Sequence, residues 1–324
     1  MFGPVWSQYF PPKPTFTAAQ HVPPGSQVGK VFIITGANQG IGFELVKMLY
    51  PTGATIYLAG RSEERVAAAI KDVIDSQQPA TPATLKYLHL DLNDLTTIKG
   101  SAAAFAVQEK KLDILWNNAG IGGNPEGTTT KQNIEGHVGT NCVAPLLFTQ
   151  SLLPQLQEAA KTAPAGSVRI IWTSSLMVET YSPPGGVQYE FLSKGKTTEP
   201  KRDYASSKVG NWFLAVEAMK RWEKDGIVSV VQNPGNLKTN IYSHQPRLFM
   251  AILNLLLYEP RLGAHTLLFA GFTPEVGIGK NNGGYIRPFG ILAPNGRQDL
   301  YEAIEKGEAT KFWGWCETQY RPYV

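Results

Sequence analysis

The sequence predicts an α/β protein with a single domain, built on a doubly wound parallel sheet of about seven strands with helices on both faces. Short apolar runs rich in Val, Ile and Tyr alternate with longer segments of helical pattern, as in repeated strand–helix–strand units. Most of these runs are apolar throughout, which is typical of parallel strands covered by helices on both sides. A glycine-rich turn directly after the first run is a third indication, because it can join a strand tightly to a helix.

The expected elements follow one another from residue 31 to residue 290. Connections between parallel strands should be right-handed crossovers. We expect strands at 31–36, 54–60, 85–92, 112–120, 167–175, 227–235 and 283–290, and helical patterns at 41–50, 62–74, 93–110, 131–160 and 204–224.

The chain departs from this rhythm at both ends and at two internal segments. We expect residues 1–29 to be an extension that packs on the body of the protein, 30–300 to be that body, and 301–324 to be a C-terminal helical extension. Residues 176–203 and 240–262 are long departures from the strand–helix pattern, and such segments are usually functional or disordered. The N-terminal extension is rich in aromatic residues, namely Phe2, Trp6, Tyr9, Phe10 and Phe16.

Composition excludes several classes of protein. The 324 residues carry a formal net charge of +4 without a run of Lys and Arg, so no nucleic-acid partner is expected. Cys142 and Cys316 have no nearby cysteine and the histidines are scattered, which excludes a disulfide framework and predicts no metal site. The N-terminus lacks the pattern of a signal peptide, and the apolar stretch Leu248–Tyr258 is shorter than the ~20 residues that span a bilayer. We expect a cytoplasmic protein without a transmembrane segment.

The turn after the first expected strand reads TGANQGIG. Its glycines permit a tight turn and the close approach of a pyrophosphate to the backbone. The helix that follows offers free N–H groups and the positive end of its dipole to the anion. The turn therefore predicts nucleotide binding in a Rossmann-like fold, and the alternative is a purely structural turn. The predicted contacts are Gly36, Asn38, Gln39, Gly40, Ile41 and Gly42.

The residue after the second expected strand indicates which nucleotide binds. An acidic residue there would bind a ribose 2′-hydroxyl and favour NAD, but the strand is followed by Arg61. A guanidinium favours a 2′-phosphate, so we predict NADPH or NADP⁺ as the cofactor. Arg65, one helical turn later, is a second candidate, and the alternative for Arg61 is an exposed arginine that opens the next helix.

Further motifs follow in a fixed order: Asp91-Leu92, NNAG at 117–120, Asn141, TSS ending at Ser175, YASSK at 204–208 and NPGNLKT at 233–239. With TGANQGIG, they make residues 30 to 290 resemble the short-chain dehydrogenase/reductase superfamily, in the branch with TGxxxGIG and YxxxK. The flanking stretches FPPKPTFT and FWGWCETQ resemble fungal members of secondary metabolism that are similar to retinol-dehydrogenase-like reductases.

The resemblance implies a catalytic set and a cofactor-binding set. Tyr204 matches the general acid/base, and Lys208 matches the lysine that holds the nicotinamide ribose and favours the phenolate of the tyrosine. Ser175 matches the serine that hydrogen-bonds the substrate oxygen, and Asn141 the asparagine that anchors a proton-relay water. The remaining implied cofactor contacts are Asp91 and Leu92 near the adenine, Asn118, Ala119 and Gly120 along the cofactor, and Pro234, Gly235, Leu237 and Thr239 around the nicotinamide amide.

The spacing of Tyr204 and Lys208 also has a chemical reason of its own. Residues four apart lie on one face of a helix, and a cation there favours the phenolate, so that the phenol can exchange a proton near neutral pH. The alternative is an exposed helix face with two long side chains. Ser174 is a second choice for Ser175, and either serine alternatively ends a strand or caps a helix. Asp91 alternatively caps the helix that follows, and Asn141 alternatively bonds locally.

These features predict an NADPH-dependent reductase that interconverts a ketone or aldehyde and an alcohol on a bulky apolar substrate, such as a fungal natural-product intermediate. The apolar character of 240–262 suggests a substrate lid, and its alternatives are a core helix or a dimer contact. Tyr181 and Tyr189 are candidate substrate contacts or surface residues. The alternative functions are an alcohol dehydrogenase acting in the oxidative direction, an NADP(H)-binding protein without turnover, and a peripheral membrane protein that uses 248–258. A homodimer is one of the oligomeric states left open.

Overall fold

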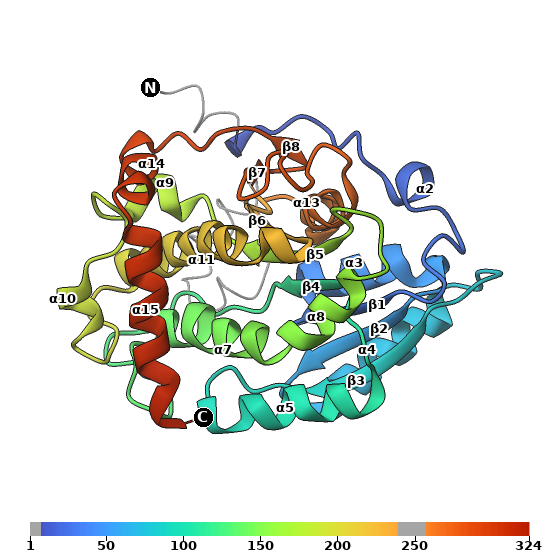
Figure 1. Cartoon of the computed structure of the whole chain (residues 1–324), viewed down its shortest axis with the longest axis horizontal. Coiled ribbons are helices and arrows are strands. Elements are labelled where there is room, and N and C mark those ends of the chain that lie inside the picture. Colours follow the sequence, from blue (N-terminus) through green and yellow to red (C-terminus); the bar gives the residue numbers. More distant parts are fainter. Residues whose placement is uncertain (1–7, 239–256, 324) are drawn as a thin grey trace.

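The computed structural model describes residues 8–238 and 257–323 of the chain. Its eight-stranded sheet has the order β3-β2-β1-β4-β5-β6-β7-β8, which confirms the predicted doubly wound α/β fold (Figure 1). All neighbouring strands pair in parallel except β7 and β8. The strands are β1 Val31–Thr35, β2 Thr55–Gly60, β3 Thr84–His89, β4 Ile114–Asn117, β5 Val168–Thr173, β6 Ile227–Gln232, β7 Tyr285–Arg287 and β8 Ile291–Leu292.

The eighth strand was not predicted from the sequence. It is antiparallel to β7 and only two residues long, too short to give a recognisable pattern. Phe289 and Gly290 between the two strands have φ angles of 37° and 91°, so the chain reverses through left-handed backbone conformations there.

Helices cover both faces of the sheet and enclose two apolar cores. Buried residues of α5, α7 and α11 form one core, and buried residues of α3, α4 and α13 form the other. Every residue of β1, β5 and β6 is buried, as expected for strands covered on both sides. These helices are α3 Gly40–Leu49, α4 Glu63–Ser76, α5 Leu95–Gln108, α7 Ala144–Ser151, α11 Pro200–Trp222 and α13 Pro260–Phe272.

The prediction of one long helical segment at 131–160 was wrong. The segment begins as α6, Gly136–Val138, continues through a π-helical turn, Gly139–Val143, and then forms α7. After Leu152 a separate helix α8 begins at Leu153 and extends to Ala160. Pro154 explains the break, because proline is accepted in the first turn of a helix but not in its interior.

The described part of the N-terminal extension lies against the body of the protein. It contains α2, Ala18–His21, and in Figure 1 it runs in blue along the upper edge of the molecule. Phe16 is buried, stacks on His21 with 3.9 Å between ring centroids and meets Phe269 of α13 edge-on at 5.4 Å.

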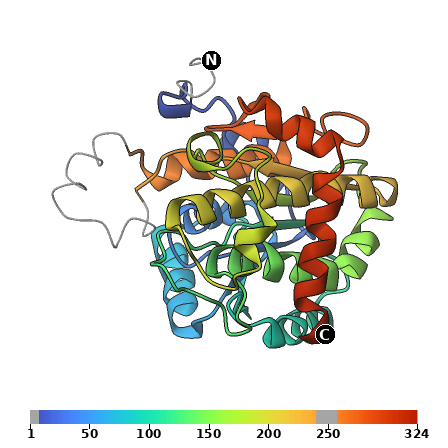
Figure 2. The same cartoon turned by 90° about the vertical axis from the view of Figure 1, so that its left-hand side faces the viewer.

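The C-terminal segment forms α14, Gln298–Glu305, and α15, Glu308–Tyr320. Figure 2 shows α15, in red, crossing the helices α11 and α7, which it contacts. Phe312, Trp313 and Cys316 of α15 are fully buried in this contact. Within the described residues, no helix is both long and apolar enough to cross a membrane.

Two predicted substrate segments differ in how much of them the structure describes. Residues 176–203 contain the short helices α9, Met177–Tyr181, and α10, Tyr189–Leu192. Tyr189 packs against α15: its ring meets the Trp315 ring edge-on, and the Lys311 ammonium lies over it. These contacts favour a packing role for Tyr189 over contact with a substrate. Tyr181 is exposed. Most of the expected lid, 240–256, lies outside the described residues.

Candidate active site

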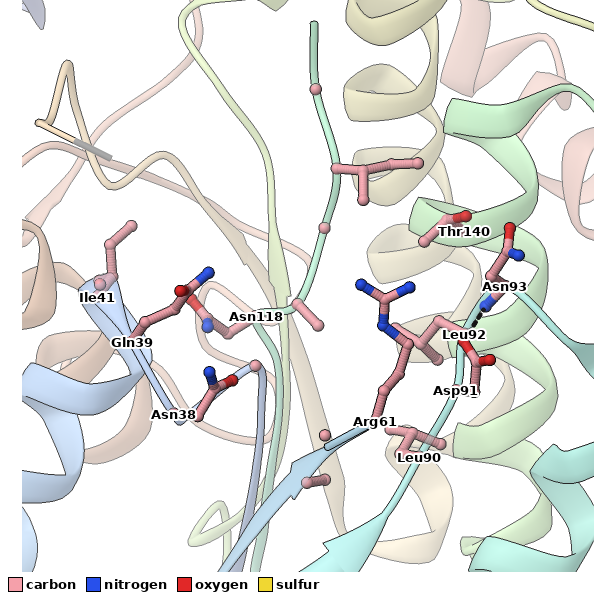
Figure 3. A pocket seen from close by; sticks show the side chains of 18 of the residues that line it. Asn38, Gln39, Ile41, Arg61, Leu90, Asp91, Leu92, Asn93, Asn118 and Thr140 are labelled. Atoms are coloured by element: carbon pink, nitrogen blue, oxygen red, sulfur yellow. Dashed lines mark hydrogen bonds between the residues drawn. The ribbon is translucent and has the colours of Figure 1, made fainter. Parts of the chain in front are cut away.

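A cavity of about 580 Å³ lies at the carboxyl ends of the central strands, where doubly wound sheets bind their ligands. Loops after β1, β2, β3 and β4 form its walls, and its volume is in the range of small-molecule sites. Figure 3 shows the glycine-loop side chains on one side and the segment after β3 on the other. Predicted residues that line the cavity are Gly36, Asn38, Gln39, Gly40, Ile41, Arg61, Asp91, Leu92, Asn118, Ala119 and Gly120.

The glycines of the loop leave room that a side chain would fill. Gly36 has a φ of 67°, and a Cβ added to it would lie 3.0 Å from the Cα of Ala119. Gly42 does not line the cavity, but a Cβ there would lie 2.8 Å from Asn118 Nδ2 and 2.9 Å from the Gly36 carbonyl oxygen. The absence of a side chain at Gly36 thus permits the tight turn beside the loop after β4. The absence of a side chain at Gly42 permits α3 to pack closely on that turn. These positions fit the close approach of a dinucleotide.

The side chain of Thr35 holds the loop after β4 in place, a role that sequence reasoning missed. Its Oγ1 accepts hydrogen bonds from the backbone N–H groups of Asn118, at 3.0 Å, and Ala119, at 2.8 Å. Asn118 Nδ2 also donates to the Thr35 carbonyl oxygen at 2.9 Å. The ends of β1 and β4 are therefore locked together under the cavity.

Arg61 follows β2 and is exposed, with its guanidinium pointing into the cavity (Figure 3). In the described ranges, 8–238 and 257–323, no carboxylate pairs with it. Arg65 does not line the cavity. Asp91 follows the neighbouring strand β3, and its Oδ1 accepts from the Asn93 N–H at 3.0 Å. The alternative that Asp91 caps α5 is wrong, because Asp94 is the N-cap residue of that helix.

Lys208 and Tyr204 lie on the same face of α11 and are both buried, so the interpretation as an exposed helix face is wrong. The Lys208 Nζ lies 5.5 Å from the centroid of the Tyr204 ring and donates to the Thr173 carbonyl oxygen at 3.1 Å. Burial lowers the pKa of Lys208 to about 8, since the low-dielectric surroundings disfavour its charged form. Because this value lies above 7, the charged ammonium form of Lys208 predominates at neutral pH.

The two serines after β5 have different surroundings. Ser174 is 2 % exposed, and its hydroxyl donates to the Lys208 carbonyl oxygen at 3.0 Å, so it fastens the strand end to α11. Ser175 is half-buried, and its Oγ accepts from the Met177 N–H at 3.2 Å at the start of α9. Of the two, Ser175 is the more accessible to a substrate.

Asn141 lies in the π-helical turn, and its side chain is bonded to the protein. Its Oδ1 accepts from the Ile121 N–H at 2.9 Å, while its Nδ2 donates to the Ile121 carbonyl oxygen and the Ser207 hydroxyl. A Cβ on Gly120 would lie 3.1 Å from Asn141 Oδ1 and 3.2 Å from Lys208 Nζ. Asn141, Gly120 and Lys208 are therefore close neighbours, and π-helical turns of this kind are frequent at functional sites.

A buried acid–histidine pair beside Tyr204 was not expected from the sequence. Glu135 is 1 % exposed and lies 3.0 Å from His137 Nδ1, and the His137 ring meets the Tyr204 ring edge-on at 5.8 Å. The Thr197 hydroxyl donates to Glu135 at 2.5 Å. Burial acts to raise the pKa of Glu135, but hydrogen bonds from His137, Thr197 and the Val138 N–H outweigh it and lower that pKa. The pair thus joins the segment 176–203 to the surroundings of Tyr204.

The loop after β6 carries the predicted residues Pro234, Gly235 and Leu237, which do not line the cavity. Gly235 has a φ of 96°, and its N–H donates to Asn233 Oδ1 at 3.0 Å, so Asn233 shapes this turn. Thr239 lies outside the described residues.

Comparison with known proteins identifies the family. The family model of the short chain dehydrogenases matches residues 30–190. The chain is 56 % identical over 322 residues to the short-chain dehydrogenase/reductase iacJ of Pestalotiopsis fici, covering 99 % of this chain and 98 % of that protein. The chain belongs to the short-chain dehydrogenase/reductase family. Members of this family bind nicotinamide cofactors, and the protein is an oxidoreductase that acts on alcohol or carbonyl groups.

Other similar proteins agree with this membership. A short-chain dehydrogenase/reductase of Phomopsis amygdali is 40 % identical, with 99 % of this chain and 97 % of that protein covered. Among solved structures, the NADPH-bound carbonyl reductase from chicken fatty liver has a TM-score of 0.58 at 23 % identity, covering 80 % of this chain and 96 % of that one. At this identity the likeness concerns the fold alone.

Several residues that line the cavity of this short-chain dehydrogenase/reductase were not predicted. Most of them are direct neighbours of predicted residues in the loops after the strands, so widening each motif by two or three positions would have found them. Thr140 and Lys238 lie next to predicted residues as well. The full set is Ala59, Gly60, Leu90, Asn93, Ile121, Gly122, Asn124, Thr140, Lys238 and Pro260.

Proposed function

We propose that the protein is an NADP(H)-dependent reductase that interconverts a ketone or aldehyde and an alcohol on a bulky apolar substrate. The observation that carries the cofactor choice is Arg61, whose guanidinium points into the cavity at the end of β2, where an acidic residue would favour NAD (Figure 3). A guanidinium recognises the oxygens of a phosphate through several hydrogen bonds at once.

The residues around the cavity suit such a cofactor. The glycine loop and the start of α3 would hold the pyrophosphate, and Asp91 and Leu92 would lie at the adenine. Gly120 would leave the space beside Lys208 open to the nicotinamide ribose. When bound, the cofactor supplies the hydride for carbonyl reduction, or accepts it in the reverse direction.

The residues of the chain would handle the proton. The hydroxyl of Ser175 would donate a hydrogen bond to the substrate oxygen and hold it near Tyr204. The Tyr204 hydroxyl would give its proton to that oxygen as negative charge develops on it. Lys208 would favour the resulting phenolate, because its buried ammonium lies beside the Tyr204 ring in surroundings of low dielectric constant. Asn141 would keep the segment after β4 in register with α11, and its role with a relay water stays a prediction.

The first experiment compares NADPH and NADH binding by tryptophan fluorescence in the wild type and in Arg61→Ala. We expect NADPH to bind at least tenfold more tightly, and we expect this preference to collapse in Arg61→Ala because the phosphate loses its partner. Arg65→Ala is the matched control, since Arg65 is also exposed near the start of α4 but does not line the cavity. Equal binding of the two cofactors by the wild type would contradict the choice of NADP(H).

A second experiment addresses catalysis with a panel of apolar aromatic ketones. Tyr204→Phe should abolish turnover and leave the NADPH dissociation constant within about twofold, since only the hydroxyl is lost. Tyr323→Phe is the control, because Tyr323 is an exposed tyrosine of the C-terminal extension. Unchanged turnover in Tyr204→Phe would exclude the proposed role. The equilibrium with the best substrate distinguishes reduction from the oxidative alternative.

Substrate class, location and assembly are parts of the same proposal. Relatives from two fungi support a fungal natural-product intermediate as the substrate, and we propose a cytoplasmic location. If the protein forms a homodimer, the pairing must use a face other than the one on α11 that α15 covers. Light scattering would distinguish the mass of one chain from that of two.

A further inference from the structure

Gln8 is a polar residue of the N-terminal extension that is nonetheless buried, with 1 % of its surface exposed. Its side-chain amide bonds to two segments far away in the sequence. The Nε2 donates to Glu179 Oε1, and the Oε1 accepts from Asn233 Nδ2 at 2.5 Å. One side chain of the extension therefore bridges α9 and the loop after β6.

Both partners of Gln8 adjoin residues of the proposed active site. Glu179 lies in α9, about one turn after Ser175. This helix begins at Met177, whose N–H donates to the Ser175 hydroxyl oxygen. Asn233 shapes the Pro234–Gly235 turn through its bond to the Gly235 N–H, and its own N–H donates to the Ile286 carbonyl oxygen. The bridge thus connects the turn after β5 with the turn after β6.

The Glu179 carboxyl group is largely shielded from water, so its hydrogen bonds come from amide groups of the protein. The residue is half-buried, and its Oε2 is buried without a hydrogen-bond partner in the described part of the chain. Asn295 Nδ2 donates to Oε1 at 2.7 Å, alongside Gln8. Burial raises the pKa of Glu179 to about 7, while the bonds from Gln8 and Asn295 act to lower it. Losing the Gln8 donor would leave a buried acceptor less well satisfied, which is costly.

From these contacts we propose that Gln8 is a positioning residue, which fixes the turn carrying Ser175 relative to the Pro234–Gly235 turn. The N-terminal extension then helps to shape the active site, at the end where the substrate and the nicotinamide would meet. This inference rests on the proposed function, because it assigns the Pro234–Gly235 turn to the nicotinamide end of the cofactor. Gln8 itself does not line the cavity, so it acts through Glu179 and Asn233.

The test separates the two ends of the cofactor by using two ligands. NADPH carries the nicotinamide, whereas 2′,5′-ADP carries the adenosine and the 2′-phosphate without it. In Gln8→Ala we expect NADPH to bind about tenfold more weakly and 2′,5′-ADP to bind within twofold of the wild type, as follows from losing a buried pair of hydrogen bonds at one end only. Gln20→Ala is the matched control, since Gln20 lies in the same extension but is exposed.

A second test exchanges the donor at Gln8 and the acceptor at Glu179, and it applies even if the alanine variant does not fold. Gln8→Glu alone should weaken NADPH binding at least tenfold, because two carboxyl groups then face each other. Adding Glu179→Gln places an amide donor opposite the new carboxylate and keeps the acceptor for Asn233, but it takes the Oε1 acceptor away from Asn295. The double variant should therefore recover part of the loss and bind NADPH at least about threefold more tightly than Gln8→Glu.

The outcomes distinguish this inference from the proposed function. If the wild type binds both ligands, and Gln8→Ala binds each of them as tightly as the wild type does, the positioning role is wrong. It is also wrong if Gln8→Ala weakens both ligands alike, or if the double variant binds as weakly as Gln8→Glu. If the wild type binds neither ligand, the proposed function fails, and the inference fails with it.

Discussion

Gly42 provides a sharp test of how α3 packs on the glycine loop. In Gly42→Ala the new Cβ would lie 2.8 Å from Asn118 Nδ2, 2.9 Å from the Gly36 carbonyl oxygen and 3.1 Å from the Cα of Ala37. Two of these atoms belong to the backbone of the turn, so rotating a side chain cannot relieve the contact. The turn or the helix must move.

The expected loss follows from two opposing effects. Overpacking of a close contact costs about 1–3 kcal/mol, while alanine gains up to about 1 kcal/mol over glycine within a helix. We therefore expect Gly42→Ala to lower the free energy of unfolding by about 1–2 kcal/mol. The matched control is Gly100→Ala in α5, where Gly100 is exposed and an added Cβ meets nothing within 4 Å. That variant should gain about 0.5–1 kcal/mol.

Urea unfolding followed by the fluorescence of the seven tryptophans measures both variants. NADPH titration adds a second readout, because a shifted turn at Gly36 and Asn118 should weaken binding in Gly42→Ala and leave it unchanged in Gly100→Ala. If Gly42→Ala proves as stabilising as Gly100→Ala and binds NADPH normally, the reasoning about close packing at Gly42 is refuted.

Three further predictions concern buried polar groups. The folded-state pKa of Lys208, about 8, lies below its unfolded value, so between pH 8 and 10 the unfolded chain binds more protons at this residue. The free energy of unfolding of the wild type in urea should therefore rise relative to that of Lys208→Met over this range, and a constant difference between the two would contradict the assignment. Thr197→Val removes the hydroxyl that donates to Glu135 and should cost about 1–3 kcal/mol in the same assay, whereas unchanged stability would show that this bond is unimportant. Arg169→Met should cost about 3 kcal/mol or more, because the buried Arg169 guanidinium donates to four backbone carbonyl groups; a loss below about 1 kcal/mol would argue against this clamp.

Local patterns in the sequence were sufficient for the main elements of the fold. The apolar runs became the strands of the sheet, because burial on both faces favours apolar side chains at most positions. The glycine spacing marked the turn between β1 and α3, where backbone conformation and close packing exclude other residues. The spacing of Tyr204 and Lys208 placed both on one face of α11, as the period of a helix requires.

Other features depended on contacts that no local pattern encodes. The structure favours Ser175 over Ser174 as the accessible hydroxyl, because Ser174 is occupied by a bond to the backbone of α11. Asp94, and not Asp91, caps α5, and both residues are of a type that prefers such positions. Strand β8 depends on its pairing with β7, since two residues carry no periodicity.

The longest connections were invisible in the sequence for the same reason. Thr197 and Glu135 are 62 positions apart, and Gln8 and Asn233 are 225 positions apart. Sequence patterns describe what each segment does with its own backbone and its own faces, so they determined the strands of the sheet, the glycine-rich turn after β1 and the shared face of Tyr204 and Lys208 on α11. Which buried polar groups meet across segments is decided only when the chain packs, because each buried donor and acceptor must find a partner among the residues that the fold brings near it.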